Sequence, residues 1–133
     1  MLNKITIGKT ATASTTVNES NTAHSVYSGS LNVFATPMMI ALMESAACEV
    51  LSDALEDGQT SVGTQINVSH IAASPLGAVI TATATITNVD GRKIDYSVVA
   101  SDEAGEVGNG THTRVVVDAT KFMAKVSGKI RRE

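Results

Sequence analysis

The chain has 133 residues, of which 43% are hydrophobic and 17% charged, as is typical of one globular domain. We therefore expect a single domain over residues 1–133. The net charge of −3 gives no electrostatic reason to expect a nucleic acid or an anionic membrane as a partner. The aromatic residues are few, so a base-stacking surface is not expected either: Tyr27, Phe34, Tyr96 and Phe122.

The single cysteine, Cys48, cannot form an internal disulfide, and its apolar neighbours indicate a small core side chain. Residues 1–10 contain no continuous apolar run of the signal-peptide type. The longest dense apolar run, residues 37–43, is too short to cross a bilayer. These features predict a cytoplasmic protein. Three scattered histidines and one cysteine show no zinc-site spacing, so no metal site is expected.

The first elements in chain order are a strand, a loop and a helix. The Thr-rich segment 5–17 favours a strand, and the polar segment 18–32 favours a loop long enough to act as a lid. Thr36-Pro37 is a helix start, with Thr36 as N-cap and Pro37 at a position that needs no donor. The helix is expected from 38 to about 55. Its first half is apolar on every side, so other structure should enclose it.

The rest of the chain predicts four strands. Residues 60–71 alternate, with one face formed by Val62, Thr64, Ile66, Val68 and His70. Residues 78–89 also alternate, with a ladder of threonines on one face. The apolar side chains on the opposite face are Ile80, Ala82, Ala84 and Ile86. Asp90-Gly91 is a hairpin signal. A third strand is marked by Ile94, Tyr96, Val98 and Ala100, and the last spans residues 107–117 after a turn at 103–105.

This order predicts an α+β fold. One apolar helix cannot be surrounded by other helices here, so an antiparallel sheet of about five strands must curl around it. That is the hotdog arrangement, which commonly forms dimers. The short basic segment 125–132 is expected to be a solvated end.

Glu44 is the most unusual residue of the helix, because it is the only charged side chain between residues 37 and 48. Its neighbours at three and four positions are small or apolar: Ile40, Ala41, Ala47 and Cys48. A buried, unpaired carboxylate is costly, so Glu44 must be paired, protonated or placed in a wet cleft. It is therefore either a catalytic carboxylate or one bonded to backbone amides or a buried partner.

Other candidates lie outside the helix interior. By strand parity His70 shares the apolar face that should meet the helix, where it could be catalytic or structural. Thr36 stands at the helix N-terminus, whose free amides could hold an oxyanion, or it could simply cap the helix. His112 and Arg114 have the opposite parity from Val115 and Val117. We expect them on the surface, where they could meet the phosphates of a ligand.

Several separated blocks of the sequence, in the right order, carry a family resemblance. They are 33–44 (VFATPMMIALME), 61–64 (SVGT), 68–70 (VSH), 72–75 (AASP), 91–93 (GRK), 110–114 (GTHTR) and 121–126 (KFMAKV). Together they resemble the fluoroacetyl-CoA thioesterase-like family of hotdog proteins. The resemblance spans about residues 33–126.

The resemblance implies a hydrolase of acyl-CoA thioesters with a Thr, Glu and His set, which falls on Thr36, Glu44 and His70. Glu44 would be the nucleophile or the base that activates water, His70 would orient this group and pass the proton onward, and Thr36 would hold substrate or water. The substrate-binding positions that the resemblance implies are Phe34, Gly63 and Arg114. No cofactor is expected beyond the coenzyme A of the substrate.

The spacing of Thr36 and Glu44 constrains such a site. Eight helical residues separate them by about 12 Å along the axis and about 80° around it. Either Thr36 stands on chain bent back before the helix, or a second copy completes the site. The second option predicts a homodimer with composite sites at the interface.

Two further expectations concern the substrate and the rival functions. In the family, fluoroacetate selectivity is associated with lid phenylalanines, whereas residues 27–32 contain only Tyr27, so a different short acyl group is expected. The alternative function is a non-catalytic acyl-CoA binding or sensing protein. A hotdog hydratase is disfavoured because the helix has no histidine near Glu44.

Overall fold

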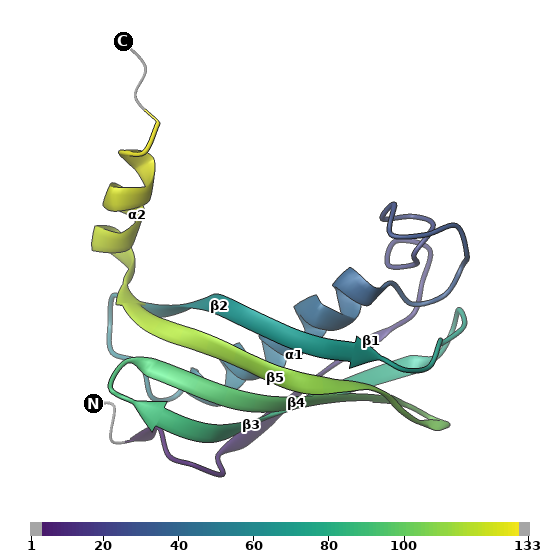
Figure 1. Cartoon of the computed structure of the whole chain (residues 1–133), viewed down its shortest axis with the longest axis horizontal. Helices are drawn as coiled ribbons and strands as arrows, with labels where there is room; N and C mark the ends of the chain where they lie inside the picture. Colours follow the sequence, from purple (N-terminus) through teal and green to yellow (C-terminus); the bar gives the residue numbers. More distant parts are fainter. Residues whose placement is uncertain (1–3, 131–133) are drawn as a thin grey trace.

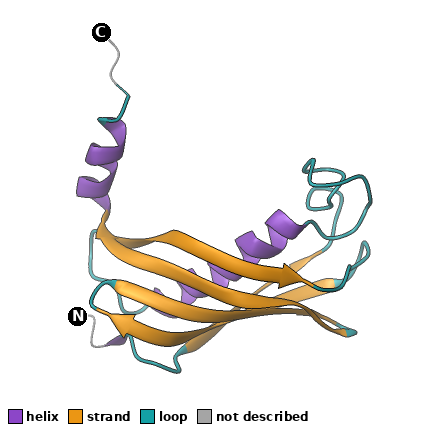
Figure 2. Ribbon diagram, in the orientation of Figure 1, coloured by secondary structure: helices purple, strands orange, loops and turns teal. Residues whose placement is uncertain are grey.

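The computed structural model describes residues 4–130. Its elements are β1 (Thr10–Thr16), α1 (Thr36–Leu51), β2 (Gln59–His70), β3 (Val79–Asp90), β4 (Lys93–Asp102), β5 (Gly105–Asp118) and α2 (Ala119–Ser127). The five strands form one antiparallel sheet in the order β1-β3-β4-β5-β2. The sheet curls around α1 (Figures 1 and 2), so the predicted α+β hotdog arrangement is confirmed.

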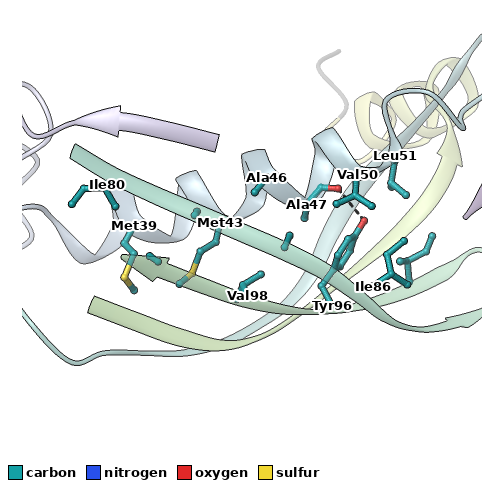
Figure 3. Close-up of a cluster of buried hydrophobic side chains, with 14 of the residues drawn as sticks. Met39, Met43, Ala46, Ala47, Val50, Leu51, Ile80, Ile86, Tyr96 and Val98 are labelled. Carbon is teal, nitrogen blue, oxygen red and sulfur yellow. Dashed lines mark hydrogen bonds between the residues drawn. The ribbon is translucent and has the colours of Figure 1, made fainter. Parts of the chain in front are cut away.

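The core lies between α1 and the inner face of the sheet (Figure 3). The alternation expected for β3 and β4 is confirmed, because Ile80, Ala82, Ala84, Ile86, Ile94, Tyr96, Val98 and Ala100 are all buried. Tyr96 adds one hydrogen bond to this apolar layer, because its hydroxyl donates to the Ala47 carbonyl of α1 at 3.1 Å. The hairpin predicted at Asp90-Gly91 joins the two strands, and Gly91 has a φ of 61°.

The N-terminal part differs from expectation in detail. The first strand begins at Thr10 instead of residue 5, although Ile5 is buried in the core. Residues 18–32 form no helix or strand, as predicted. Two isolated β-bridges hold this part of the chain in place, and they join Thr22 to Phe34 and Val33 to Pro75.

Helix α1 begins at Thr36, the residue that was expected to cap it. Ala35 is the N-cap, with no side-chain hydrogen bond, and Thr36 is the first helical residue. The prediction of Thr36 as N-cap is therefore wrong, because its hydroxyl bonds to another segment. The helix also ends at Leu51, where the Ser52 hydroxyl and amide both bond to the Glu49 carbonyl.

The single chain does not enclose α1. Met39 and Met43 are fully buried against the sheet, but Ala41 is exposed and Ile40 and Leu42 are only half-buried. Cys48, which was predicted in the core, is exposed on the same outer side. One apolar face of the helix is thus left uncovered by residues 4–130.

A β-bulge in β2 changes which residues face the helix. The pairing with β5 shifts between Gly63 and Gln65, so Thr64 is an extra residue. An extra residue reverses the faces on one side of it. Ile66, Val68 and His70 face inward as predicted. Before the bulge, Ser61 and Gly63 face inward instead of Val62, so the prediction of one continuous face was wrong.

The last strand also places its polar residues differently. His112 and Arg114 are only 2% and 6% exposed, so the prediction that they lie on the surface was wrong. Their parity was read correctly, but Val115 and Val117 occupy the outer face and the polar pair faces α1. The reason is chemical, because Glu44 lies on that side of the helix and requires a cation.

Beyond β5, helix α2 includes residues 125–127 of the segment expected as a solvated end, whose residues 131 and 132 lie outside the described residues. In this helix no residue is buried, and Figure 1 shows it rising past the β2 edge of the sheet. Asp118 caps it by accepting from the Lys121 amide. Within residues 4–130, no helix is long and apolar enough to span a membrane.

Candidate active site

Thr36 and His70 form one half of the candidate site. Thr36 lies in the first turn of α1 and His70 at the end of β2, and Thr36 Oγ1 is 2.7 Å from His70 Nδ1. Both residues line an open cleft of about 250 Å³ whose other walls come from the lid segment and from the chain after β2. The pair therefore meets the cleft at the N-terminus of the helix, where backbone amides and the helix dipole favour developing negative charge.

The His70 ring is partly buried, and burial lowers its pKa below the ordinary value of 6.5. It is therefore neutral at physiological pH. Its second nitrogen, Nε2, is buried and has no hydrogen-bond partner among residues 4–130. An unpartnered buried ring nitrogen is costly unless a ligand meets it. His70 thus combines one nitrogen anchored by Thr36 with one buried nitrogen that lacks a partner among residues 4–130.

Glu44 belongs to a second cluster, two helical turns further along α1. Its Oε2 is 3.4 Å from Arg114 Nη1 and 4.0 Å from His112 Nε2, and its side chain is 41% exposed. The structure thus shows two of the surroundings that the sequence allowed for Glu44, a cationic partner and contact with solvent, and its catalytic role stays a prediction. The carboxylate has a cationic partner from β5 and is also open to solvent, so it is paired without being sealed off.

Arg114 is held by more than Glu44. Its Nε donates to Ser61 Oγ at 2.8 Å and its Nη2 to the Ser61 carbonyl at 3.0 Å. Since Ser61 lies on the inner face only because of the bulge in β2, the bulge helps to orient the guanidinium. A planar, always-charged fork fixed at three nitrogens is a well-defined partner for a carboxylate.

Gly63 lies beside this cluster. A Cβ atom at this position would be 2.7 Å from Glu44 Oε2, 3.2 Å from His112 Cε1 and 3.3 Å from Arg114 Nη1. Only glycine lets the three side chains approach the strand this closely. Gly63 thus lies against the Glu44 cluster, and its expected role in substrate binding stays a prediction.

The structure brings together only part of the predicted set. Thr36 meets His70, whereas Glu44 meets Arg114 and His112. Because Thr36 is helical, the chain does not bend back before the helix, and its separation from Glu44 stays at about 12 Å along the axis. Sequence reasoning missed His112, Ser61 and the Gln65 carbonyl as members of the Glu44 cluster. The need of Glu44 for a cationic partner was the one feature of the sequence from which an inward-facing Arg114 could have been predicted.

Tyr27 lies within the lid segment and Phe34 follows it. Phe34 is buried and lines both the cleft and a neighbouring apolar groove against Met38 and Leu42. Tyr27 has a φ of 61° and is 96% exposed, so it contributes no aromatic wall to the cleft. Within residues 4–130, no group of three or more His, Cys, Asp or Glu side chains could hold a metal ion.

Known proteins share this arrangement of helices and strands. A model of the fluoroacetyl-CoA-specific thioesterases (FlK) matches residues 17–120 of the chain. The chain is also 45% identical to the fluoroacetyl-CoA thioesterase of Streptantibioticus cattleyicolor over 97 residues. These 97 residues cover 73% of this chain and 70% of that protein. The chain belongs to this thioesterase family. Its resemblance to the family, expected from the sequence blocks, is therefore confirmed, and the family comprises hydrolases of acyl-CoA thioesters.

Solved structures agree with the family assignment. A fluoroacetyl-CoA thioesterase superposes with a TM-score of 0.90 at 37% identity, over 95% of this chain and 98% of that one. Variants of that thioesterase have been solved with fluoroacetate and CoA, and with acetyl-CoA. A hot-dog-like protein from Thermanaerovibrio acidaminovorans superposes with a TM-score of 0.89 at 27% identity, over 99% of this chain and 98% of that one. The hotdog fold of this thioesterase family member is thereby confirmed.

Proposed function

We propose that the protein hydrolyses a short-chain acyl-CoA thioester to the free acid and CoA, with Glu44, His70 and Thr36 as catalytic residues. The observation that carries the proposal is the Thr36–His70 hydrogen bond in the wall of the cleft, with a neutral histidine whose Nε2 has no partner in residues 4–130. Family membership supplies the reaction class.

The chemistry needs an oxygen that attacks the carbonyl carbon, a group that takes its proton, and a donor for the oxyanion. Glu44 acts as nucleophile or as the base that activates water, and Arg114 Nη1, 3.4 Å from its Oε2, orients the carboxylate for either role. The first turn of α1 and Thr36 hold the carbonyl or the water. As the carbon–sulfur bond breaks, neutral His70 passes the proton taken from the attacking water through Nε2 to the CoA sulfur, which leaves as the thiol.

The acyl group is short. A cleft of about 250 Å³ lies below the range of about 300–1,000 Å³ usual for sites that enclose drug-sized ligands. It suits a small acyl group with the pantetheine chain leading outward. Because Tyr27 points into solvent and the lid carries no phenylalanine, selection for fluoroacetyl-CoA is not part of the proposal.

The active unit is a homodimer. Strand β2 is an edge of the sheet, so one row of its backbone donors and acceptors is open to a second strand. The exposed side of α1 and the apolar side chains of α2, which include Met123 and Val126, also lack cover in one chain. Antiparallel pairing of two β2 strands reverses one against the other. It therefore carries the Glu44–Gly63 cluster of one subunit toward the Thr36–His70 pair of its partner.

Activity is tested on the purified protein with a panel of acyl-CoAs and a thiol reagent. We expect turnover of acetyl-, propionyl- and butyryl-CoA, and its loss in Glu44→Gln and His70→Ala. Glu49→Gln is the matched control, because Glu49 lies on the same helix but is exposed and outside both clusters. Turnover that is absent in the wild type, or unaffected by Glu44→Gln, contradicts the proposal.

The composite site has its own test, in which two inactive variants are refolded together. If each site combines Glu44 of one subunit with His70 of the other, a Glu44→Gln/His70→Ala heterodimer keeps one intact site. Half the dimers with half their sites then give about a quarter of the wild-type activity. A site within one subunit leaves the mixture inactive, and a monomer in analytical ultracentrifugation also excludes the dimer.

A further inference from the structure

His112 is a buried histidine that the proposed mechanism does not use. It lies on β5 with a side chain that is only 1% exposed, and it is enclosed by four elements. Gln65 of β2, Tyr96 of β4, Arg114 of its own strand and Glu44 of α1 surround its ring. A polar ring is costly to bury at such a position unless its two nitrogens are both used.

The two nitrogens of His112 have partners of opposite kind. Nδ1 is 2.7 Å from the Gln65 carbonyl oxygen, which can only accept, so Nδ1 carries the proton. Nε2 is 3.2 Å from Arg114 Nη1, which can only donate, so Nε2 must be the unprotonated acceptor. The two neighbours together select one neutral tautomer. Burial lowers the pKa of His112, and Arg114 lowers it too, although the Gln65 and Glu44 oxygens act in the other direction.

This tautomer fixes the orientation of the Nη1 group of Arg114. The Nη1 group has two N–H bonds, and it contacts both His112 Nε2 and Glu44 Oε2, the latter at 3.4 Å. With one N–H accepted by the ring, the other points to the carboxylate. Ser61 holds Nε and Nη2, so the guanidinium has no freedom to turn away. In the part of the chain that the structure describes, no hydrogen bond reaches Oε1 of Glu44, so that oxygen stays available for reaction.

The ring itself is fixed from the opposite side. Tyr96 pairs with His112 in the β4–β5 register, and their rings stack with centroids 5.8 Å apart and planes at 24°. The Tyr96 hydroxyl is anchored to the Ala47 carbonyl, one turn after Glu44 on the same helix. The ring of His112 is therefore held by Tyr96 of β4, which is itself bonded to the helix that carries Glu44.

We infer that His112 is a positioning residue: its Nδ1-protonated imidazole holds Arg114 so that Nη1 orients the Glu44 carboxylate for thioester hydrolysis. The inference rests on the proposed function in one respect only, which is that Glu44 is the reacting carboxylate. The tautomer and its contacts are properties of the chain and can be measured without any substrate.

Three substitutions separate positioning from packing. His112→Gln keeps an oxygen acceptor that can reach Arg114, His112→Asn keeps a donor near Gln65 but no acceptor at Nε2, and His112→Phe keeps only the stacked ring. We expect Asn and Phe to lower kcat about 10- to 100-fold, the range seen when a group that orients a catalytic ligand is lost. KM for acetyl-CoA should change less than about threefold, since the substrate is not contacted. Gln should restore most of kcat.

Two results would overturn the inference. One is an equal loss of kcat in the His112→Gln, His112→Asn and His112→Phe variants, because an acceptor oxygen would not restore kcat if the role of His112 were purely structural. The other is kcat retained in Phe. Thermal unfolding of each variant shows which losses come from instability.

The independent measurement is nitrogen-15 NMR of the His112 ring at neutral pH. It should show a protonated Nδ1 and a bare Nε2, and an Nε2–H tautomer or a cationic ring contradicts the inference. If the wild type proves inactive while the tautomer is as stated, the proposed function has failed and the ring geometry has not. If activity depends on Glu44 but not on an acceptor at position 112, only the positioning inference has failed.

Discussion

Arg114 Nη1 lies 3.4 Å from Glu44 Oε2, so a strand residue and a helix residue that are 70 positions apart form the charged pair of the site. The pair joins β5 to the middle of α1 and leaves the carboxylate partly open to solvent. Its geometry explains how an otherwise apolar helix can carry an ionised side chain. The orientation of the Glu44 carboxylate, the reactive group of the proposed mechanism, therefore depends on a residue of the sheet.

Removing the guanidinium should harm activity more than folding. We expect Arg114→Gln to lower kcat about 10- to 100-fold and the free energy of unfolding by about 1–3 kcal/mol, because the Ser61 and His112 acceptors lose a buried donor. Ser61→Ala removes only the Nε bond and should have a smaller effect on both quantities. Steady-state kinetics and urea unfolding measure them. A Ser61→Ala loss as large as that of Arg114→Gln would contradict this account.

The Thr36 hydroxyl should serve His70 and not the helix. Thr36→Ser keeps the bond to Nδ1 and should keep most of kcat, whereas Thr36→Val should lower kcat about 10- to 100-fold. Because Ala35 is the N-cap, Thr36→Val should cost less than the roughly 1 kcal/mol of a lost cap. Urea unfolding distinguishes the two cases, and a loss of stability without loss of kcat would restore Thr36 to a capping role.

Gly63→Ala should separate site geometry from fold stability. Its Cβ would meet the Glu44 carboxylate at 2.7 Å, and a flexible side-chain end can move away. We expect kcat to fall by at least about tenfold while unfolding changes by no more than about 1 kcal/mol. Gly110→Ala is the contrasting variant, because its Cβ would overlap the Asn67 carbonyl oxygen of the paired strand. That variant should unfold readily, and a stable Gly110→Ala protein would show that the β2–β5 contact is looser than described.

Acid should weaken the fold through both buried histidines. Burial lowers the pKa of His70 and of His112 below 6.5, so below that pH the unfolded chain binds more protons than the folded one. The free energy of unfolding must then fall as pH falls from 6.5 toward the folded-state pKa values, and is fully retained above 6.5. Urea unfolding at about pH 7.5 and about pH 5.5 measures the loss. His112→Gln should show a smaller loss, and an equal or greater one would contradict the assignment of His112.

The same titration bears on catalysis. His70 acts as a neutral ring, so kcat/KM should be constant above its pKa and decline as pH falls through it, below 6.5. The acid limb should therefore disappear or move in a His70 variant with residual activity. A limb that stays at the same pH in His112→Gln and in wild type assigns it to His70. A limb that persists unchanged without His70 belongs to another group.

Local patterns were sufficient for much of the fold. The alternation of Ile80 to Ile86 and of Ile94 to Ala100 correctly located two inner strand faces, because a half-buried strand repeats every two residues. An apolar helix with one carboxylate singled out Glu44 before any contact was known. These features depend on neighbours a few residues away, which is why a sequence can reveal them.

The sequence by itself thus determined the helix and sheet and the family resemblance, and it selected Thr36, Glu44 and His70 as candidate site residues. Only the tertiary structure decided that Thr36 bonds to His70 and that Glu44 pairs with Arg114 beside His112. One extra residue at Thr64 reverses the inner face of β2, and no local pattern announces it. The inward turn of Arg114 likewise follows from a carboxylate on a distant helix, because charges are paired in space and not along the chain.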